Sequence, residues 1–457
     1  MQNRTLALLR NRLMRWTTRA DAGLESLEAR QMLSIELPEG ASMVTWGGDQ
    51  VASVTGSYIL TYEGRLGSEQ AELLAREAAT RLGVQVESVR SLGRGGWAEL
   101  KTTGVVTAEA ASRVAREIGP IVGIEPNSLK KLQRSPDDPQ FGSQWGLANN
   151  GQQIPEQTGQ LGAIGADINA TGAWDVTIGS RNVVIAVIDS GVDLQHPDLA
   201  ANIWVNPGEV AGNGLDDDGN GFVDDVNGWD FGSSDSNPDA DQSPQAEVAR
   251  YHGTQVASAI AAVGNNGAGV TGVSWNSQLM VLKVTGLEGG LTTAAIVEAH
   301  DYATLMKEQF GINIVVANAS YKGEIDYSAF STVNLVAEQA AVANFVATGA
   351  TYVTSAGNEG RDLDGVPIGL FPEAFWDLPG VITVASTDNL DNAAAFSNFG
   401  VRNVDVAAPG VNIWMATEGG GYVYGSGTSY SAAIVSGIAA LVYSVKPNAS
   451  GTEVREA

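Results

Sequence analysis

The C-terminal two thirds of the chain carries short, almost continuously apolar runs rich in β-branched residues. Strands buried on both faces of a parallel sheet have this pattern, because neither face meets water. Stretches with helical spacing lie between most of these runs, at 254–263, 292–307 and 330–348. We therefore predict an α/β domain with a doubly wound, mostly parallel sheet that binds ligands beyond the carboxyl ends of its strands. The predicted strands are 182–188, 279–284, 312–318, 352–357 and 381–386.

A different pattern precedes this domain. Between about residues 57 and 131, two amphipathic helices alternate with four short strands in the order βαββαβ, which is the ferredoxin-like arrangement. A loop rich in Asp, Pro and Ser follows at 135–143 and indicates a boundary. We assign 51–134 to a small α+β domain and 135–457 to the α/β domain. The predicted helices are 68–83 and 107–119, and the strands are 57–63, 84–90, 96–102 and 121–127.

The first 50 residues predict an export leader. Six arginines stand against three acidic residues in the first 30 positions of an otherwise acidic chain, and no apolar run is long enough to span a membrane. The segment LEARQMLS at 27–34 resembles the Leu-Glu-Pro-Arg-type element at the start of many exported proteins of one bacterial group, with Ala29 in place of proline. A disordered basic leader is the alternative.

Composition narrows the classes of function. The 457 residues include no cysteine, which excludes thiol nucleophiles, disulfides and thiolate metal sites. A formal net charge of −26 argues against nucleic acids and anionic membrane surfaces as partners. An extracellular protein of this kind would be stabilised by packing or by ions bound through oxygen ligands.

Four polar residues occupy positions suited to catalysis. Ser429 opens an apolar helical run, where the free N–H groups of a helix N-terminus stabilise developing negative charge. Asp189 ends the first predicted strand, and Asn358 ends the fourth. His252 opens a helix, a position that lowers the pKa of an imidazole and keeps it neutral enough to act as a base. Taken singly, each is also explained as a turn or capping residue.

These residues lie in segments that together resemble the subtilisin-like serine proteases, or subtilases. AVIDSGVDLQHPDL surrounds Asp189, HGTQVA surrounds His252, GTSYSAAIVSG surrounds Ser429, and SAGN ends at Asn358. The order Asp, His, Ser is the one found in subtilisin. The resemblance covers residues 140–457 and implies that Ser429 is the nucleophile, His252 the base, Asp189 its orienting partner and Asn358 an oxyanion donor. It also implies that the small domain is an inhibitory propeptide.

The resemblance further implies where a peptide substrate binds. The substrate would lie as an added strand against the segments around Gly289 and Ser320, with pocket walls from NASYKG and AGN. Several positions depart from the family pattern. Lys322 stands where relatives usually have glycine, Gln255 and Ser258 replace a histidine and a glycine of HGTHVAG, and Ala433 replaces a proline. The implied substrate-binding residues are Gly289, Ser320, Tyr321, Lys322, Gly323, Ala356 and Gly357.

An acidic insertion at 206–250 separates Asp189 from His252. Its centre, DDDGNGFVDD, has Asp216, Asp218 and Asn220 at alternate positions and a glycine at the sixth, which is the spacing of a calcium loop. The twelfth position is Asn227 instead of glutamate, and a solvated acidic loop is the alternative. We predict Ca²⁺ bound by Asp216, Asp218, Asn220, the Phe222 carbonyl, and one or both of Asp224 and Asp225. The family resemblance alone implies a second calcium site with Asp198 and Asn266.

Three functions compete on these grounds. The leading hypothesis is a secreted bacterial serine endopeptidase that is made as a self-processing zymogen and stabilised by calcium, with protein substrates and its own propeptide as partners. The second is a catalytically inactive surface or binding protein on a subtilase scaffold. The third is a peptidase dedicated to one peptide leader. Because the capping box at 450–453 opens a helix only a few residues before the chain ends, we also expect a domain truncated at its C-terminus.

Overall fold

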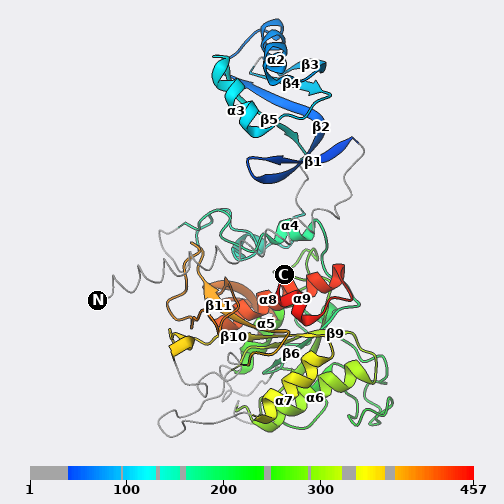
Figure 1. The fold of residues 1–457 in the computed structure, drawn as a ribbon. Coiled ribbons are helices and arrows are strands. Elements are labelled where there is room, and N and C mark those ends of the chain that lie inside the picture. Colours follow the sequence, from blue (N-terminus) through cyan, green and yellow to red (C-terminus); the bar gives the residue numbers. More distant parts are fainter. Residues whose placement is uncertain are drawn as a thin grey trace, which may run out of the picture. The chain divides into compact units, whose positions relative to one another are not determined.

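The computed structural model describes residues 40–93, 96–129, 134–154, 161–240, 249–286, 290–321, 336–365 and 376–457. Its contacts divide the chain into two compact units, Met1–Leu132 and Gln133–Ala457 (Figure 1). Each unit has its own hydrophobic core.

The N-terminal unit contains the predicted βαββαβ order. Helices α2 (Ser68–Leu82) and α3 (Ala108–Glu117) pack against a five-stranded antiparallel sheet, and alanines of α2 lie in the core. Thr107 caps α3 by accepting from the Ala110 N–H. The strands are β1 (Ala41–Trp46), β2 (Asp49–Tyr62), β3 (Val86–Leu92), β4 (Trp97–Thr102) and β5 (Ile121–Ser128).

One part of this sheet was not predicted. Strand β1 pairs with the first half of β2, so that β2 begins eight residues before the predicted strand. Residues 41–56 mix small, polar and apolar side chains, and most of the described ones are only partly buried. Their sequence therefore lacks the strict alternation that indicates a half-buried strand.

The C-terminal unit is built on a seven-stranded sheet in the order β12-β11-β10-β9-β6-β8-β7, and every pairing in it is parallel. The doubly wound α/β prediction is therefore confirmed. The five predicted strands are β6 (Val184–Asp189), β8 (Gln278–Lys283), β9 (Ile314–Ala319), β10 (Thr351–Ser355) and β11 (Val381–Thr387). The edge strands β7 (Gly228–Asp230) and β12 (Val406–Pro409) were not predicted, because they are too short to form an apolar run.

Helices cover both faces of this sheet (Figure 1). Along β6, Ile185 and Val187 join the core that includes α5 (Ala249–Ala261) and α8 (Thr428–Val445), whereas Ala186 and Ile188 join the core of α6 (Thr293–Glu308) and α7 (Val336–Ala347). Burial on both faces is the physical reason for the unbroken apolar run. Two shorter helices, α4 (Ala170–Trp174) and α9 (Gly451–Arg455), complete the described set.

Helix α8 lies deep in the domain. Among the described residues it alone has the length and mean hydropathy, 1.4, of a membrane span, but 78% of it is buried inside the protein. This burial is that of a core helix. Near the chain end, the predicted capping box of Ser450 and Glu453 is present, Val454 is buried, and Arg455 pairs with Asp405 at 2.7 Å.

Candidate active site

The carboxyl ends of three neighbouring strands bring the candidate residues together. Asp189 is the last residue of β6, Ser320 follows β9, and Asn358 lies three residues beyond β10. Because parallel strands share one carboxyl edge, residues more than 160 positions apart in the sequence meet there. The edge itself is rigid, since all six residues of β6 are buried.

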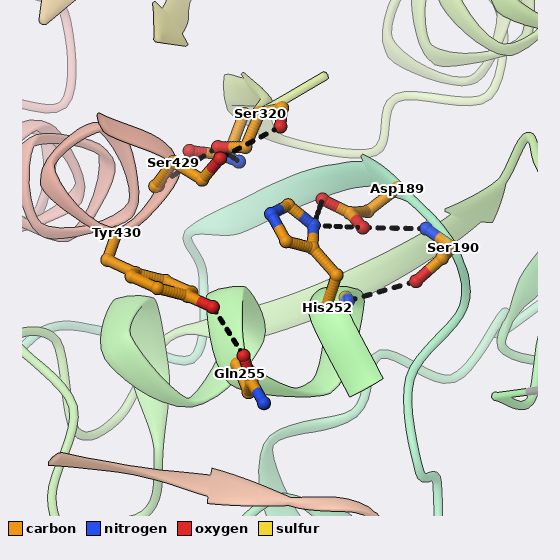
Figure 2. A network of polar contacts seen from close by, with 9 residues as sticks. Asp189, Ser190, His252, Gln255, Ser320, Ser429 and Tyr430 are labelled. Carbon is orange, nitrogen blue, oxygen red and sulfur yellow. Dashed lines mark hydrogen bonds and ion pairs between the residues drawn. The ribbon is translucent and has the colours of Figure 1, made fainter. Parts of the chain in front are cut away.

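His252 faces Asp189 from the first turn of α5 (Figure 2). The His252 Nδ1 atom lies 2.8 Å from one Asp189 carboxylate oxygen and 3.0 Å from the other. A carboxylate only accepts hydrogen bonds, so Nδ1 carries the proton and Nε2 keeps its lone pair. The structure thus holds the imidazole in the tautomer of a general base.

Ser190 connects the strand end to the helix. Its N–H donates to Asp189 Oδ1 at 2.7 Å, and its Oγ accepts from the Gly253 N–H at 3.0 Å. Gly253 has no room for a side chain, because a Cβ there would lie 2.1 Å from the Gly191 carbonyl oxygen. The glycine after His252 therefore allows the helix to approach the strand end.

The helix also begins earlier than predicted, at Ala249 instead of residue 254, so His252 lies inside its first turn. Burial lowers the pKa of His252, but the charge of Asp189 and its hydrogen bond raise it by more. The net pKa lies above the ordinary value. The expectation that the helix N-terminus would lower it was wrong, because the adjacent carboxylate dominates.

Ser429 lies in the first turn of α8, on the other side of the His252 ring from Asp189 (Figure 2). Its Oγ donates to the Ser320 carbonyl at 3.1 Å, and the Ser320 Oγ donates to the Ser429 carbonyl at 3.0 Å. These two bonds tie the start of α8 to the end of β9. The hydroxyl must leave the Ser320 carbonyl before it attacks a substrate.

Asn358 is oriented by the residue before Ser429. Its Oδ1 accepts from the Thr428 N–H at 2.9 Å and from the Thr428 hydroxyl at 3.0 Å. With the carbonyl end of the carboxamide held in this way, the Nδ2 donors point away from Thr428. The donor end of the carboxamide has the chemistry that an oxyanion site needs, so the donor role of Asn358 stays a prediction.

Comparison with known proteins assigns the family. Residues 180–457 match the model of the subtilase family, which covers more than half of the chain. The chain belongs to the subtilase family. As a subtilase, it is a serine-type endopeptidase.

Three similar proteins agree with this assignment. A thermophilic serine proteinase from Bacillus sp. (strain AK1) is 27% identical over 94% of this chain and 88% of its own length. An extracellular protease from Xanthomonas campestris pv. campestris is 30% identical over 72% of this chain but only 53% of its own length. The solved structure of a protease from Pseudoalteromonas arctica matches with a TM-score of 0.50 and 28% identity, over 70% of this chain and 91% of that one.

The predicted substrate-binding residues are only partly described. Ser320, Tyr321, Ala356 and Gly357 lie at the same sheet edge as the Asp189–His252 pair, directly after β9 and β10. Asn398 supports this edge, because its Nδ2 donates to the Ala356 carbonyl at 2.8 Å. The predictions for Gly289, Lys322 and Gly323 lie outside the described residues.

The described part of the acidic insertion, 206–240, has little regular structure, and its carboxylates divide into separate groups. Oxygens of Glu209, Asp216 and Asp218 lie within 4.8 Å of one another, a grouping that could hold a metal ion. Glu209 was not predicted as a ligand, because it lies seven residues before the loop motif in the sequence. Only the folded loop brings its carboxylate close to Asp216 and Asp218. Its Oε1 accepts from the Asp217 N–H at 2.9 Å.

The other predicted ligands of this loop have further contacts, and their role as calcium ligands stays a prediction. Asp224 accepts from the backbone N–H groups of residues 212–214 at 2.7 to 3.1 Å. Asp225 is fully buried, and Asn206, Asn220 and the Tyr302 hydroxyl donate to it. Burial raises the pKa of Asp225 to about 6. Phe222 packs its ring against Trp229 and Tyr302.

The second predicted calcium position is a tight hydrogen-bonded cluster. Asn266 Nδ2 donates to Asp198 Oδ1 at 3.0 Å, and the Val270 N–H and the Tyr422 hydroxyl donate to Asp198 Oδ2 at 2.8 and 2.9 Å. Asp138, which was not predicted, accepts from the Asn265 N–H at 2.7 Å. The structure therefore brings Asp198 and Asn266 together, beside a second buried carboxylate.

Proposed function

We propose that this subtilase cleaves peptide bonds through an Asp189–His252–Ser429 triad. The observation that carries the proposal is the double contact of His252 Nδ1 with the Asp189 carboxylate, with Ser429 on the opposite side of the ring. An imidazole held in this tautomer offers Nε2 to the serine proton. The position of Ser429 at the start of a buried helix supplies backbone N–H groups for the developing charge.

Each residue then has a defined role in acyl transfer. Ser429 Oγ attacks the carbonyl carbon of the peptide while His252 Nε2 takes its proton. The carbonyl oxygen becomes an oxyanion, held by the Asn358 Nδ2 donors and the Ser429 N–H. The C–N bond breaks as His252 returns the proton to the leaving amine, and an acyl-enzyme remains. Water, deprotonated by the same imidazole, releases the acyl group and restores Ser429.

We also propose that the enzyme is made as a zymogen and secreted. The N-terminal unit has the ferredoxin-like order that the family resemblance associates with an inhibitory propeptide. The division between the two units, after Leu132, falls within the sequence segment 130–140, where self-cleavage is proposed. The related protease from Xanthomonas campestris is named as extracellular, which supports export of this chain.

Calcium is the proposed structural ion. Glu209, Asp216 and Asp218 supply only oxygen donors within one small region, and hard oxygen donors are the ligands that Ca²⁺ prefers. We propose these three carboxylates as the ligands in the acidic loop, and Asp198 with Asn266 at the second position. A bound cation would offset the mutual repulsion of the carboxylates and link the loop segments that carry them.

The test is intact-mass spectrometry of the wild type and of Ser429→Ala after incubation. Self-cleavage near residues 131–140 is expected in the wild type and absent in the variant, because removal of the nucleophile lowers kcat about 2 × 10⁶-fold in subtilisin. Ser426→Ala is a matched control, since Ser426 is an exposed serine three residues earlier. Persistent cleavage in Ser429→Ala would refute self-processing by this serine.

A further inference from the structure

A hydrogen bond beside the proposed triad joins two side chains from the segments that resemble the family motifs. Tyr430 follows the nucleophile, and Gln255 stands where the family usually has a second histidine. The Tyr430 hydroxyl donates a short hydrogen bond to Gln255 Oε1 (Figure 2). The Tyr430 side is buried, with 9% of the residue exposed, whereas Gln255 is partly buried.

The bond joins the two helices that carry the base and the nucleophile. Gln255 lies three residues after His252 on α5, and residues at this spacing share one face of a helix. Tyr430 lies one residue after Ser429 in the first turn of α8. The bond therefore ties the second turn of α5, one turn after His252, to the first turn of α8, and so restricts the separation of His252 and Ser429.

The Tyr430 ring also borders the imidazole. Its centroid lies 6.0 Å from that of His252, with 35° between the ring planes. On another side the ring is confined by Gly425, where a Cβ would lie 2.7 Å from Tyr430 Cε2. A ring held between Gly425 and His252 limits how far the imidazole swings away from Asp189.

Other bonds hold α5 in place without this one. The Gly253 N–H donates to Ser190, Thr254 Oγ1 accepts from the Asp193 N–H, and Ser258 Oγ accepts from the Ala416 N–H. Ser320 likewise holds the start of α8. Removal of the Tyr430 hydroxyl should therefore leave the fold intact and change only the link between the two helices.

We propose that Tyr430 and Gln255 are positioning residues, a clasp between α5 and α8 that holds the His252 imidazole in register with Ser429. The proposal rests on the triad of the proposed function. It assigns a role to Gln255, where this chain differs from the family pattern, and to the residue next to the nucleophile. Neither side chain takes or gives the proton of the reaction.

The test is a double-mutant cycle on the purified protein, with p-nitrophenyl acetate as a small ester that needs no substrate pocket. Tyr430→Phe and Gln255→Met are each expected to lower the acylation rate about three- to tenfold, with KM within about twofold, because each removes the same neutral hydrogen bond. The double variant should be no slower than the slower single variant. Tyr443→Phe is the control, since that hydroxyl bonds to Gly349 and Thr351 farther along α8.

A second readout does not depend on activity. The chain has only three histidines, so the imidazole ¹⁵N resonances of His252 can be followed in protein labelled at histidine. They should shift in Tyr430→Phe and in Gln255→Met but not in Tyr443→Phe. The proposal would be overturned if the rate loss of the double variant equalled the product of the two single losses, or if the His252 resonances did not shift in the two variants. If Ser429 of the wild type is not acylated, the triad proposal fails. The His252 resonances then test by themselves whether Tyr430 and Gln255 position the imidazole.

Discussion

Two regions of the catalytic unit carry functional polar side chains: the sheet edge with Asp189, His252 and Ser429, here called the triad edge, and the acidic loop with Glu209, Asp216 and Asp218. Different forces hold the side chains of the two regions in place. Asp189 ends a strand that is buried throughout, and its partners come from helices that lie in the core. The Glu209, Asp216 and Asp218 carboxylates lie on a segment without helix or strand and are held mainly by backbone N–H groups. Packing defines the first region, whereas the second gathers like charges that favour a cation.

This difference separates activity from stability. The geometry of His252 and Ser429 should persist when the acidic loop loosens, because no residue of the Glu209 cluster contacts them in the described structure. The loop nevertheless reaches the domain core, since Asp225 accepts a hydrogen bond from Tyr302 of α6. We therefore expect changes at the triad edge to alter rates, and changes in the loop to alter unfolding.

The largest effect after removal of Ser429 or His252 is expected for Asp189→Asn. This exchange lowers kcat about 10⁴-fold in serine proteases, because the amide favours the wrong imidazole tautomer. Asp193→Asn is the control, since Asp193 lies four residues away and accepts from the Gly419 N–H instead of contacting His252. Hydrolysis of fluorescent casein measures both. Equal losses in the two variants would mean that the Asp189–His252 contact has no special role.

A smaller loss is expected for Asn358→Ala. Removal of the corresponding carboxamide donor in subtilisin lowers kcat about 10² to 10³-fold, because the oxyanion loses one hydrogen bond. Asn358→Asp keeps an acceptor for Thr428 but lacks the N–H groups, so it should lose activity as well. Steady-state kinetics on one substrate would show a fall in kcat with little change in KM. An active Asn358→Asp variant would contradict the proposed donor role.

Calcium removal tests the other region. A cation present at 100 times its dissociation constant stabilises the folded state by about 2.7 kcal/mol, which for a unit of this size corresponds to a fall in Tm of roughly 4 °C on chelation. Glu209→Gln and Asp218→Asn should reduce this dependence on calcium, whereas the exposed Asp301→Asn on α6 should not. Differential scanning calorimetry makes the measurement. A Tm that is insensitive to both chelation and Glu209→Gln would exclude an ion at this cluster.

The smallest expected effect is on the pH profile. The base must be neutral, and Asp189 raises the pKa of His252 above its ordinary value near 6.5. Activity should therefore fall with decreasing pH through an apparent pKa above about 6.5 in kcat/KM, which reports the free enzyme. Asp189→Asn removes the charge that raises this pKa, so the acid limb of its residual activity should move to lower pH. If the acid limb of the pH profile stayed at the same pH in Asp189→Asn, the group that titrates would not be His252.

The sequence predicts features that depend on residues close together along the chain better than contacts between residues far apart in the sequence. The apolar run before Asp189 reports burial on both faces of β6, a local property that is visible along the chain. Glu209 joins Asp216 and Asp218 only through the folding of an irregular loop, and no periodicity indicates that contact. The Tyr430–Gln255 bond likewise spans 175 positions. The edge strands β7 and β12 of the parallel sheet were missed because they are only three and four residues long, shorter than the apolar runs that predict the other strands of that sheet.

The most direct test of the central claim is labelling of the wild type with a fluorophosphonate, with and without a calcium chelator, at a temperature where both samples remain folded. Peptide mass spectrometry then locates the phosphonylated residue. We predict that Ser429 is labelled in both samples at similar rates, because packing holds the triad edge, while the Tm differs between them. An unlabelled Ser429, or a label at another serine, would contradict the proposed nucleophile. Labelling of Ser429 only in the presence of calcium would contradict the separation of the two regions.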